Sequence, residues 1–181
     1  MFIINNIILQ VDCSRGSTSD RDAFAALLKE LSAAFKPKGL LLSAGVSASK
    51  EIVDVAYDVP VLIEYLDWIN VMSYDYHGYW EGKTGHVAPL YRDPDEHIEH
   101  MNANFSMIHW LKKGVPSNKL IMGVPAYGQS FTLSEESREE VTPGFNVEVS
   151  GPGQPGDFTK SAGMLAYYEV RKFICICMTN D

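Results

Sequence analysis

The sequence is poor in cysteine. Three cysteines occur in 181 residues, at Cys13, Cys175 and Cys177. An odd number gives no closed disulfide framework, and the spacing is not that of a zinc site. The chain must therefore fold by burying apolar side chains.

Long hydrophobic runs are also lacking, because no stretch approaches the roughly 18 apolar residues that a membrane-spanning helix needs. Residues 1–11 are largely apolar, but they lack the basic start and the small-residue cleavage site of a signal peptide. We expect no membrane partner, no functional signal peptide, and an irregular or strand-like segment at this end.

Basic residues are in short supply. Lys and Arg number 15 against 23 Asp and Glu, which gives a net charge of −8. Nucleic acids and anionic membranes bind clusters of Lys and Arg, so both are unlikely partners on physical grounds, and a neutral or cationic ligand fits better. Glycine-rich phosphate-binding loops are lacking too, and we expect no cofactor.

Hydrophobic residues make up 46% of the chain, enough for the core of one ordinary domain. Apolar periodicity predicts helices over 20–35, in two pieces within 50–66, over about 93–111, and from about 160 to 167. Short apolar runs predict strands at 40–46, 69–74 and 120–124. This alternation indicates an α/β protein with parallel strands. Three parallel strands expose both sheet edges, so we expect them to belong to a larger sheet.

The segment 69–77 carries the clearest functional signal. It begins as a buried strand and ends in Tyr74, Asp75 and His77, and Trp80 follows in a glycine-containing loop. Tyr127 follows the third strand. The C-terminal ends of parallel strands are where α/β proteins bind ligands, so these side chains are candidates for one site.

Some of these residues also have purely structural interpretations. Asp75 could cap a loop, and Trp80 could pack beneath one. His97 and His100, three residues apart, favour a solvated helix face over a metal site because no further ligands complete a set. The sequence gives no nucleophile elbow for a Ser-His-Asp triad. Neither Glu64, Asp67 nor Glu81 stands at a strand end, where a general acid would be needed.

Collinear motifs nevertheless resemble one family over roughly 155 residues. They are Asp20–Phe24, Leu27–Leu31, Gly39–Ala44, Ala56–Pro60, Ile69–Gly78, Thr84–His86, Ala88–Tyr91, Gly123–Phe131 and Leu165–Glu169. From Ser14 to Val170 the chain resembles animal, especially arthropod, chitinases of glycoside hydrolase family 18. Such enzymes cut the β-1,4 links of chitin with the substrate's own N-acetyl oxygen as the nucleophile.

The resemblance implies a (β/α)8 TIM barrel with a small α+β insertion after the seventh strand. The three predicted strands would be about the fifth to seventh of that barrel. The expected domains are a partial barrel at 14–133 and the start of the α+β insertion at 134–170. Residues 1–13 and 171–181 are expected to be non-homologous, which suggests an incomplete product. An extracellular location is implied for the parent family.

The resemblance also implies roles for six residues. Tyr74 would bind the acetamido group, Asp75 would contact sugar polar groups, and Met72 would line the floor. Trp80, Tyr127 and Gln129 would be further sugar contacts, with Gln129 where many members have Arg. The family's acidic motif Asp-x-x-Asp-x-Asp-Trp-Glu does not occur in this sequence. The implied function is a chitinase fragment without its catalytic Glu, or alternatively a non-catalytic chitin-binding or signalling protein.

Overall fold

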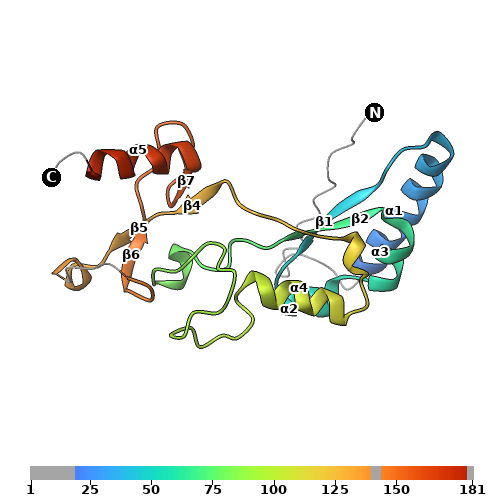
Figure 1. Ribbon diagram of the computed structural model, residues 1–181, viewed down its shortest axis with the longest axis horizontal. Coiled ribbons are helices and arrows are strands. Elements are labelled where there is room, and N and C mark those ends of the chain that lie inside the picture. Colours follow the sequence, from blue (N-terminus) through green and yellow to red (C-terminus); the bar gives the residue numbers. More distant parts are fainter. Residues whose placement is uncertain (1–18, 140–143, 179–181) are drawn as a thin grey trace. The chain divides into compact units, whose positions relative to one another are not determined.

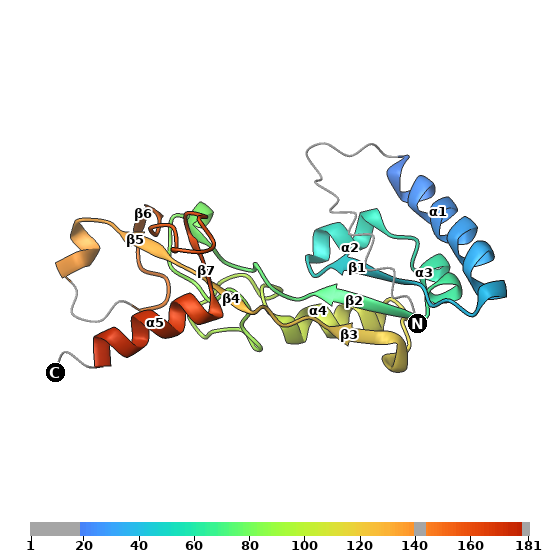
Figure 2. The ribbon, with the colours of Figure 1, turned by 90° about the horizontal axis from the view of Figure 1, so that it is seen from above.

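The computed structural model describes residues 19–139 and 144–178. The predicted segment 1–13, with Cys13, and the last residues of the predicted tail lie outside this range. Two compact units divide the chain. The first comprises residues up to Ser73 together with His100–Gly123, and the second comprises Tyr74–Glu99 together with the chain from Val124 onward. Each unit is built around its own strands, as Figures 1 and 2 show.

The first unit contains the predicted parallel sheet. Strands β1 (Ser43–Ser47), β2 (Trp68–Met72) and β3 (Leu120–Met122) lie in the order β1-β2-β3. Both pairings are parallel, with Ala44 opposite Ile69 and Ile69 opposite Leu120. The parallel pairing expected from the alternation of elements is therefore confirmed. Each strand starts or ends a few residues from its predicted limits.

Helices lie in both connections between these strands, as parallel pairing requires, and one further helix precedes β1. They are α1 (Asp20–Phe35), α2 (Lys50–Ala56), α3 (Val59–Tyr65) and α4 (Ala103–Lys112), with 3-10 turns η1 (Lys36–Lys38) and η3 (Ser117–Lys119). The bounds predicted for α1 are confirmed, and two short helices occur within 50–66 as expected. The core includes Leu28, Leu62, Val46, Val71 and Trp110, all almost completely buried.

The helix predicted over 93–111 is wrong in its start. The Asn102 side chain accepts a hydrogen bond from the Phe105 N–H at 2.9 Å, and this cap starts α4 at Ala103. Trp110 lies inside and its indole N–H donates to the Ser47 carbonyl at 3.0 Å. That anchor fixes the rotation of the helix, so its apolar residues Ile108 and Leu111 are exposed.

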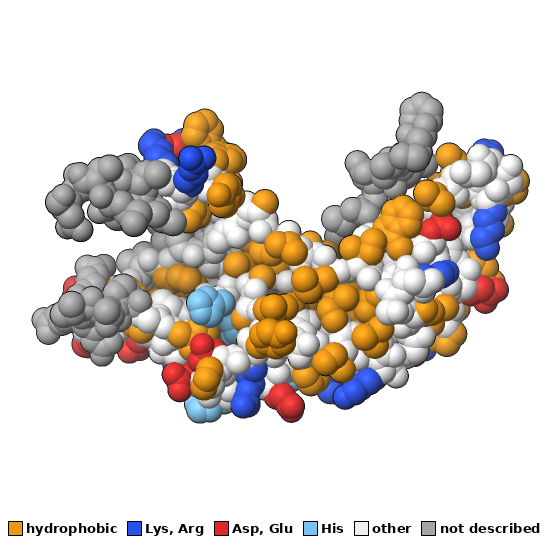
Figure 3. Space-filling view, in the orientation of Figure 1, with side chains coloured by type: hydrophobic (Ala, Val, Ile, Leu, Met, Phe, Trp, Pro, Cys, Tyr) orange, Lys and Arg blue, Asp and Glu red, His pale blue; other side chains and the backbone are white. Residues whose placement is uncertain are grey.

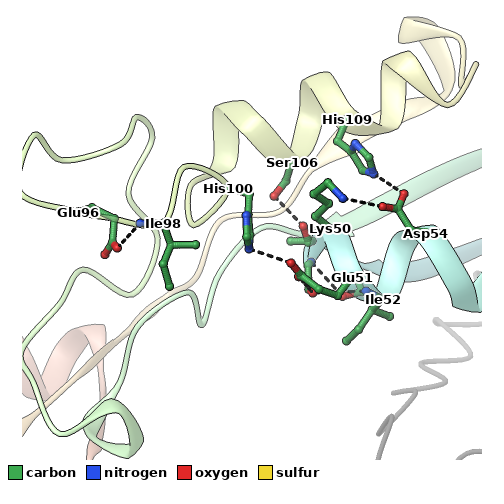
Figure 4. A network of polar contacts seen from close by, with 12 residues as sticks. Lys50, Glu51, Ile52, Asp54, Glu96, Ile98, His100, Ser106 and His109 are labelled. Carbon is green, nitrogen blue, oxygen red and sulfur yellow. Dashed lines mark hydrogen bonds and ion pairs between the residues drawn. The ribbon is translucent and has the colours of Figure 1, made fainter.

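Polar contacts join α2 to α4 on the outside of this unit (Figure 4). The Asp54 carboxylate forms ion pairs with Lys50, His109 and Lys113, with nitrogen-to-oxygen distances of 2.9, 2.8 and 2.6 Å. Hydrogen bonds from Lys113 and then Lys50 hold the pKa of Asp54 well below its usual range. His100 contacts Glu51 at 3.0 Å. His109 and Lys113 thus tether α4 and its C-terminal end to Asp54 on α2, so these partly exposed charges have a structural explanation.

The second unit contains two small antiparallel sheets. Strand β4 (Tyr127–Gln129) pairs with β7 (Met164–Ala166), and β5 (Phe131–Leu133) pairs with β6 (Val149–Pro152). The unit also holds the 3-10 turns η2 (Tyr79–Glu81) and η4 (Glu136–Glu139) and the helix α5 (Tyr167–Met178). Within this unit, a β-bridge between Lys83 and Glu148 joins the loop after β2 to the segment that leads into β6.

The helix predicted from about 160 to 167 is wrong. Lys160 has a φ of 52° and Gly163 a φ of 81°, and neither value continues a right-handed helix. The chain turns there, forms β7, and begins α5 only at Tyr167. The apolar residues of 164–166 pair with β4 instead of lining a helix.

Candidate functional site

The candidate site is built around Asp75, three residues after the end of β2. Asp75 has a φ of 59°, in the left-handed region that Asp tolerates better than most residues. Its side chain is exposed. The left-handed conformation ends the extended run, and β2 stops at Met72, short of the predicted limit at Tyr74.

Two side chains of β4 reach this carboxylate. The Tyr127 hydroxyl donates to Oδ1 of Asp75 at 2.7 Å, and Nε2 of Gln129 donates to the same oxygen at 3.3 Å. Residues two apart on a strand share a face, which explains why both point the same way. The structure thus brings together three of the residues that the sequence predicts for one site.

Aromatic rings frame this group. The Tyr74 and Tyr127 rings meet edge to face, with centroids 6.2 Å apart. Burial, and next the hydrogen bond to Asp75, raise the pKa of the Tyr127 hydroxyl above its usual range. The hydroxyl therefore remains a proton donor to Asp75 at any physiological pH. The arrangement holds a carboxylate rigidly beside apolar ring surfaces, a combination that suits a ligand with polar edges and apolar faces.

Trp80 lies in the 3-10 turn η2 and is 55% exposed, with its ring packed edge to face on Tyr79. Hydrophobic side chains are common on the face of the molecule that Figure 3 presents. The Trp80 ring also covers Gly78, because a Cβ on that glycine would lie 2.2 Å from the ring atoms Cη2 and Cζ3. Glycine at 78 is thus required for the ring to lie in this place.

We expect Gly78→Ala to move the Trp80 ring while leaving the fold intact, because the ring is largely exposed and has room to shift away from the added methyl group. The change should alter the position and intensity of tryptophan fluorescence with little change in melting temperature. Gly128→Ala is the control, since its added Cβ would find only an ordinary contact, with Val170 at 4.0 Å. Identical spectra for Gly78→Ala and the native chain would contradict the expectation.

His77 does not join Asp75, although the sequence places both in one polar segment. The imidazole is buried, with Nδ1 at 2.9 Å from Glu81 and Nε2 at 3.4 Å from Glu96. It also meets the Phe145 ring edge to face. Its two nitrogens are occupied by the loop's own carboxylates, so His77 holds the loop together and Glu81 has a structural partner.

Met72 is half-buried as the last residue of β2 and belongs to the first compact unit. Its predicted place at the floor of the site stays a prediction. Within the described ranges, no cluster of His, Cys, Asp and Glu could hold a metal ion. His97 and His100 lie in an irregular segment and not on a helix face as predicted. No helix in the described part of the chain is long and apolar enough to cross a membrane.

Glu169 has a role that sequence reasoning did not assign. It is 4% exposed, and its carboxylate accepts hydrogen bonds from the backbone N–H groups of Phe158, Thr159 and Ala166 at 2.8, 3.1 and 2.9 Å. Burial opposes ionisation, but these three donors outweigh it and lower the pKa of Glu169 to about 2. The sequence signal that could have indicated this role is a carboxylate in the first turn of a helix that follows a Gly- and Pro-rich loop.

Comparison with known protein families identifies the class of protein to which the parallel sheet and the Asp75 group belong. The model of the glycosyl hydrolases family 18 matches residues 5–180, and the chain belongs to this family. The resemblance inferred from the motifs is confirmed. The match reaches into both segments expected to be non-homologous, while the domain boundaries at 13, 133 and 170 stay a prediction.

Particular relatives are chitinases and a chitinase-like protein. The probable chitinase 10 of Drosophila melanogaster is 52% identical over 161 residues, which are 89% of this chain and 7% of that protein. Catalytic domain 2 of the Group II chitinase of Ostrinia furnacalis superposes with a TM-score of 0.87 at 44% identity, over 93% of this chain and 43% of that one. Human YKL-39, described as a pseudo-chitinase with retained chitooligosaccharide binding, gives 0.78 at 37% identity, over 87% and 46%.

These solved relatives imply a TIM-barrel-like α/β fold. The chain spans less than half the length of each of them. The first sheet, with its parallel strands and crossover helices, is consistent with such a fold.

Proposed function

We propose that this chain forms the sugar-positioning part of a family 18 chitinase domain and binds chitin or chitooligosaccharides without cutting them by itself. The observation that carries the proposal is the fixed trio of Asp75, Tyr127 and Gln129. A carboxylate oriented by two donors can accept hydrogen bonds from sugar hydroxyl and amide groups.

The remaining predicted contacts extend this surface. Tyr74 would hydrogen-bond the acetamido group, and its ring lies against Tyr127. Trp80 would stack on a sugar ring, for which its exposed face is suited, and Met72 would line the floor. This chain would be a partial TIM barrel of about strands five to seven with the start of the α+β insertion, and the parent protein would act outside the cell.

A non-catalytic chitin-binding or signalling protein is the second candidate. Human YKL-39, a relative of this chain, is described as a pseudo-chitinase that retains chitooligosaccharide binding. Loss of cleavage with retention of binding is therefore a combination that occurs in this family. It matches a chain whose sequence supplies polar sugar contacts and does not contain the family's acidic motif.

We expect Trp80→Ala to weaken binding to chitin beads by roughly tenfold or more, because stacking of an exposed ring on a flat ligand face contributes about 1–3 kcal/mol in comparable aromatic platforms. Bound and free chain are measured after pelleting the beads.

The matched control is Tyr167→Ala, which removes another exposed aromatic from the second unit. Equal loss of binding in both variants would point to nonspecific adhesion by exposed rings. A native chain that never pellets with chitin would refute the proposed function.

A further inference from the structure

The Asp75 carboxylate is held in the candidate site by uncharged partners. Both side chains that bind it, the Tyr127 hydroxyl and the Gln129 amide, are neutral donors, and both act on Oδ1. Among the described residues, no Lys, Arg or His forms an ion pair with Asp75. The carboxylate is thus oriented without being neutralised, and its side chain is exposed to a ligand.

The side chain at position 129 determines whether the Asp75 carboxylate has a positively charged partner. Nε2 of Gln129 lies 3.3 Å from Oδ1 of Asp75, so a guanidinium at this position would come within ion-pairing distance and cancel the charge. An amide gives the same carboxylate a donor without a positive charge. Position 129 therefore sets the electrostatic character of the site while Tyr127 sets its geometry.

We propose that the Asp75–Gln129 pair makes this site select chitooligosaccharides that carry a free amine, that is, partly deacetylated chains with a glucosamine unit. The inference rests on the proposed function and adds the substrate class to it. A protonated sugar amine is a cation with three N–H donors, and an unneutralised carboxylate is its natural partner. An acetamido group at the same place is neutral and gains no such attraction.

The test compares fully N-acetylated oligomers with oligomers of equal length in which one unit, at each position in turn, is glucosamine. Binding to the full chain is measured by titration calorimetry at low salt and mildly acidic pH, where an aliphatic amine is protonated. We expect one amine-bearing isomer to bind about tenfold tighter, equal to about 1.4 kcal/mol. The preference should shrink in high salt, which screens exposed charges.

Three variants test whether the Asp75–Gln129 pair causes the preference for the amine-bearing oligomer. Gln129→Arg should bind both oligomers equally. Asp75→Asn removes the charge with the same shape and should also lose the preference, which decides the question if Gln129→Arg fails to fold. Gln154→Arg, the same substitution at an exposed position outside the Asp75–Tyr127–Gln129 group, should keep the preference.

The outcomes separate the two proposals. Equal binding of both oligomers by the native chain overturns the amine preference and leaves chitooligosaccharide binding standing. A preference that survives in Asp75→Asn also overturns it, because the net charge of −8 would then be its source. No binding of either oligomer contradicts the proposed function itself.

Discussion

The 181-residue chain alone is expected to release no product from a chitooligosaccharide, although it should bind one. Cleavage of a glycosidic bond requires a carboxylic acid that protonates the leaving oxygen, and such an acid has a raised pKa. The family's acidic motif Asp-x-x-Asp-x-Asp-Trp-Glu, which would supply this acid, does not occur in this sequence. Proton donation contributes about 10²–10⁴-fold to a rate, so its loss should remove measurable turnover.

Product release from a fluorogenic chitooligosaccharide by the purified chain measures this. Asp75→Asn and Tyr127→Phe serve as controls for contaminating host enzyme. Activity that is the same in all three samples comes from the contaminant. Activity in the native chain that both substitutions abolish would show that the chain supplies its own proton donor, and the prediction would be wrong.

The second large effect is on stability. Glu169→Gln should lower the melting temperature by roughly 5–10 °C, because an amide offers one oxygen where the carboxylate uses both, and a buried N–H left without its acceptor is costly. Oε1 of Glu169 serves Phe158 and Thr159, and Oε2 serves Ala166. Thermal melts followed by circular dichroism give the difference.

The same substitution should change the response to acid. The folded-state pKa of Glu169 lies at about 2, below its ordinary value of 4.5. Its contribution to stability is thus complete above about pH 4.5 and is lost as the pH falls toward 2. The native chain should lose stability more steeply than Glu169→Gln in that window. Glu135→Gln, which alters an exposed side chain, should retain the native slope.

The parallel sheet could be predicted from the sequence because its strands are short apolar runs between helical stretches. Helix α1 was predicted well for the same reason, since its apolar residues repeat at spacings of three and four. The start of helix α4 was not predicted, because it is set by an Asn cap and not by the spacing of aliphatic residues. Asn102 sets the start of the helix, and Trp110 sets its inner face through a hydrogen bond to Ser47.

The site could be predicted in part. Strand ends and motif resemblance indicated Asp75 and Tyr127, and the structure joins them directly. The role of His77 could not be predicted, since its partner Glu96 comes from a stretch expected to be helical. Glu169 has backbone partners 3 to 11 residues away, in a loop without a regular pattern. Contacts of this kind depend on loop geometry that no sequence periodicity encodes.

The left-handed backbone at Asp75 restricts how this position can evolve. Among the residues one nucleotide change away from Asp, Asn, Gly and His adopt a φ near 59° more readily than Val, Ala, Tyr and Glu. Loss of the negative charge without loss of the turn is therefore open mainly through Asn, Gly or His. A descendant that abandons sugar binding while keeping its fold should carry one of these three residues at position 75.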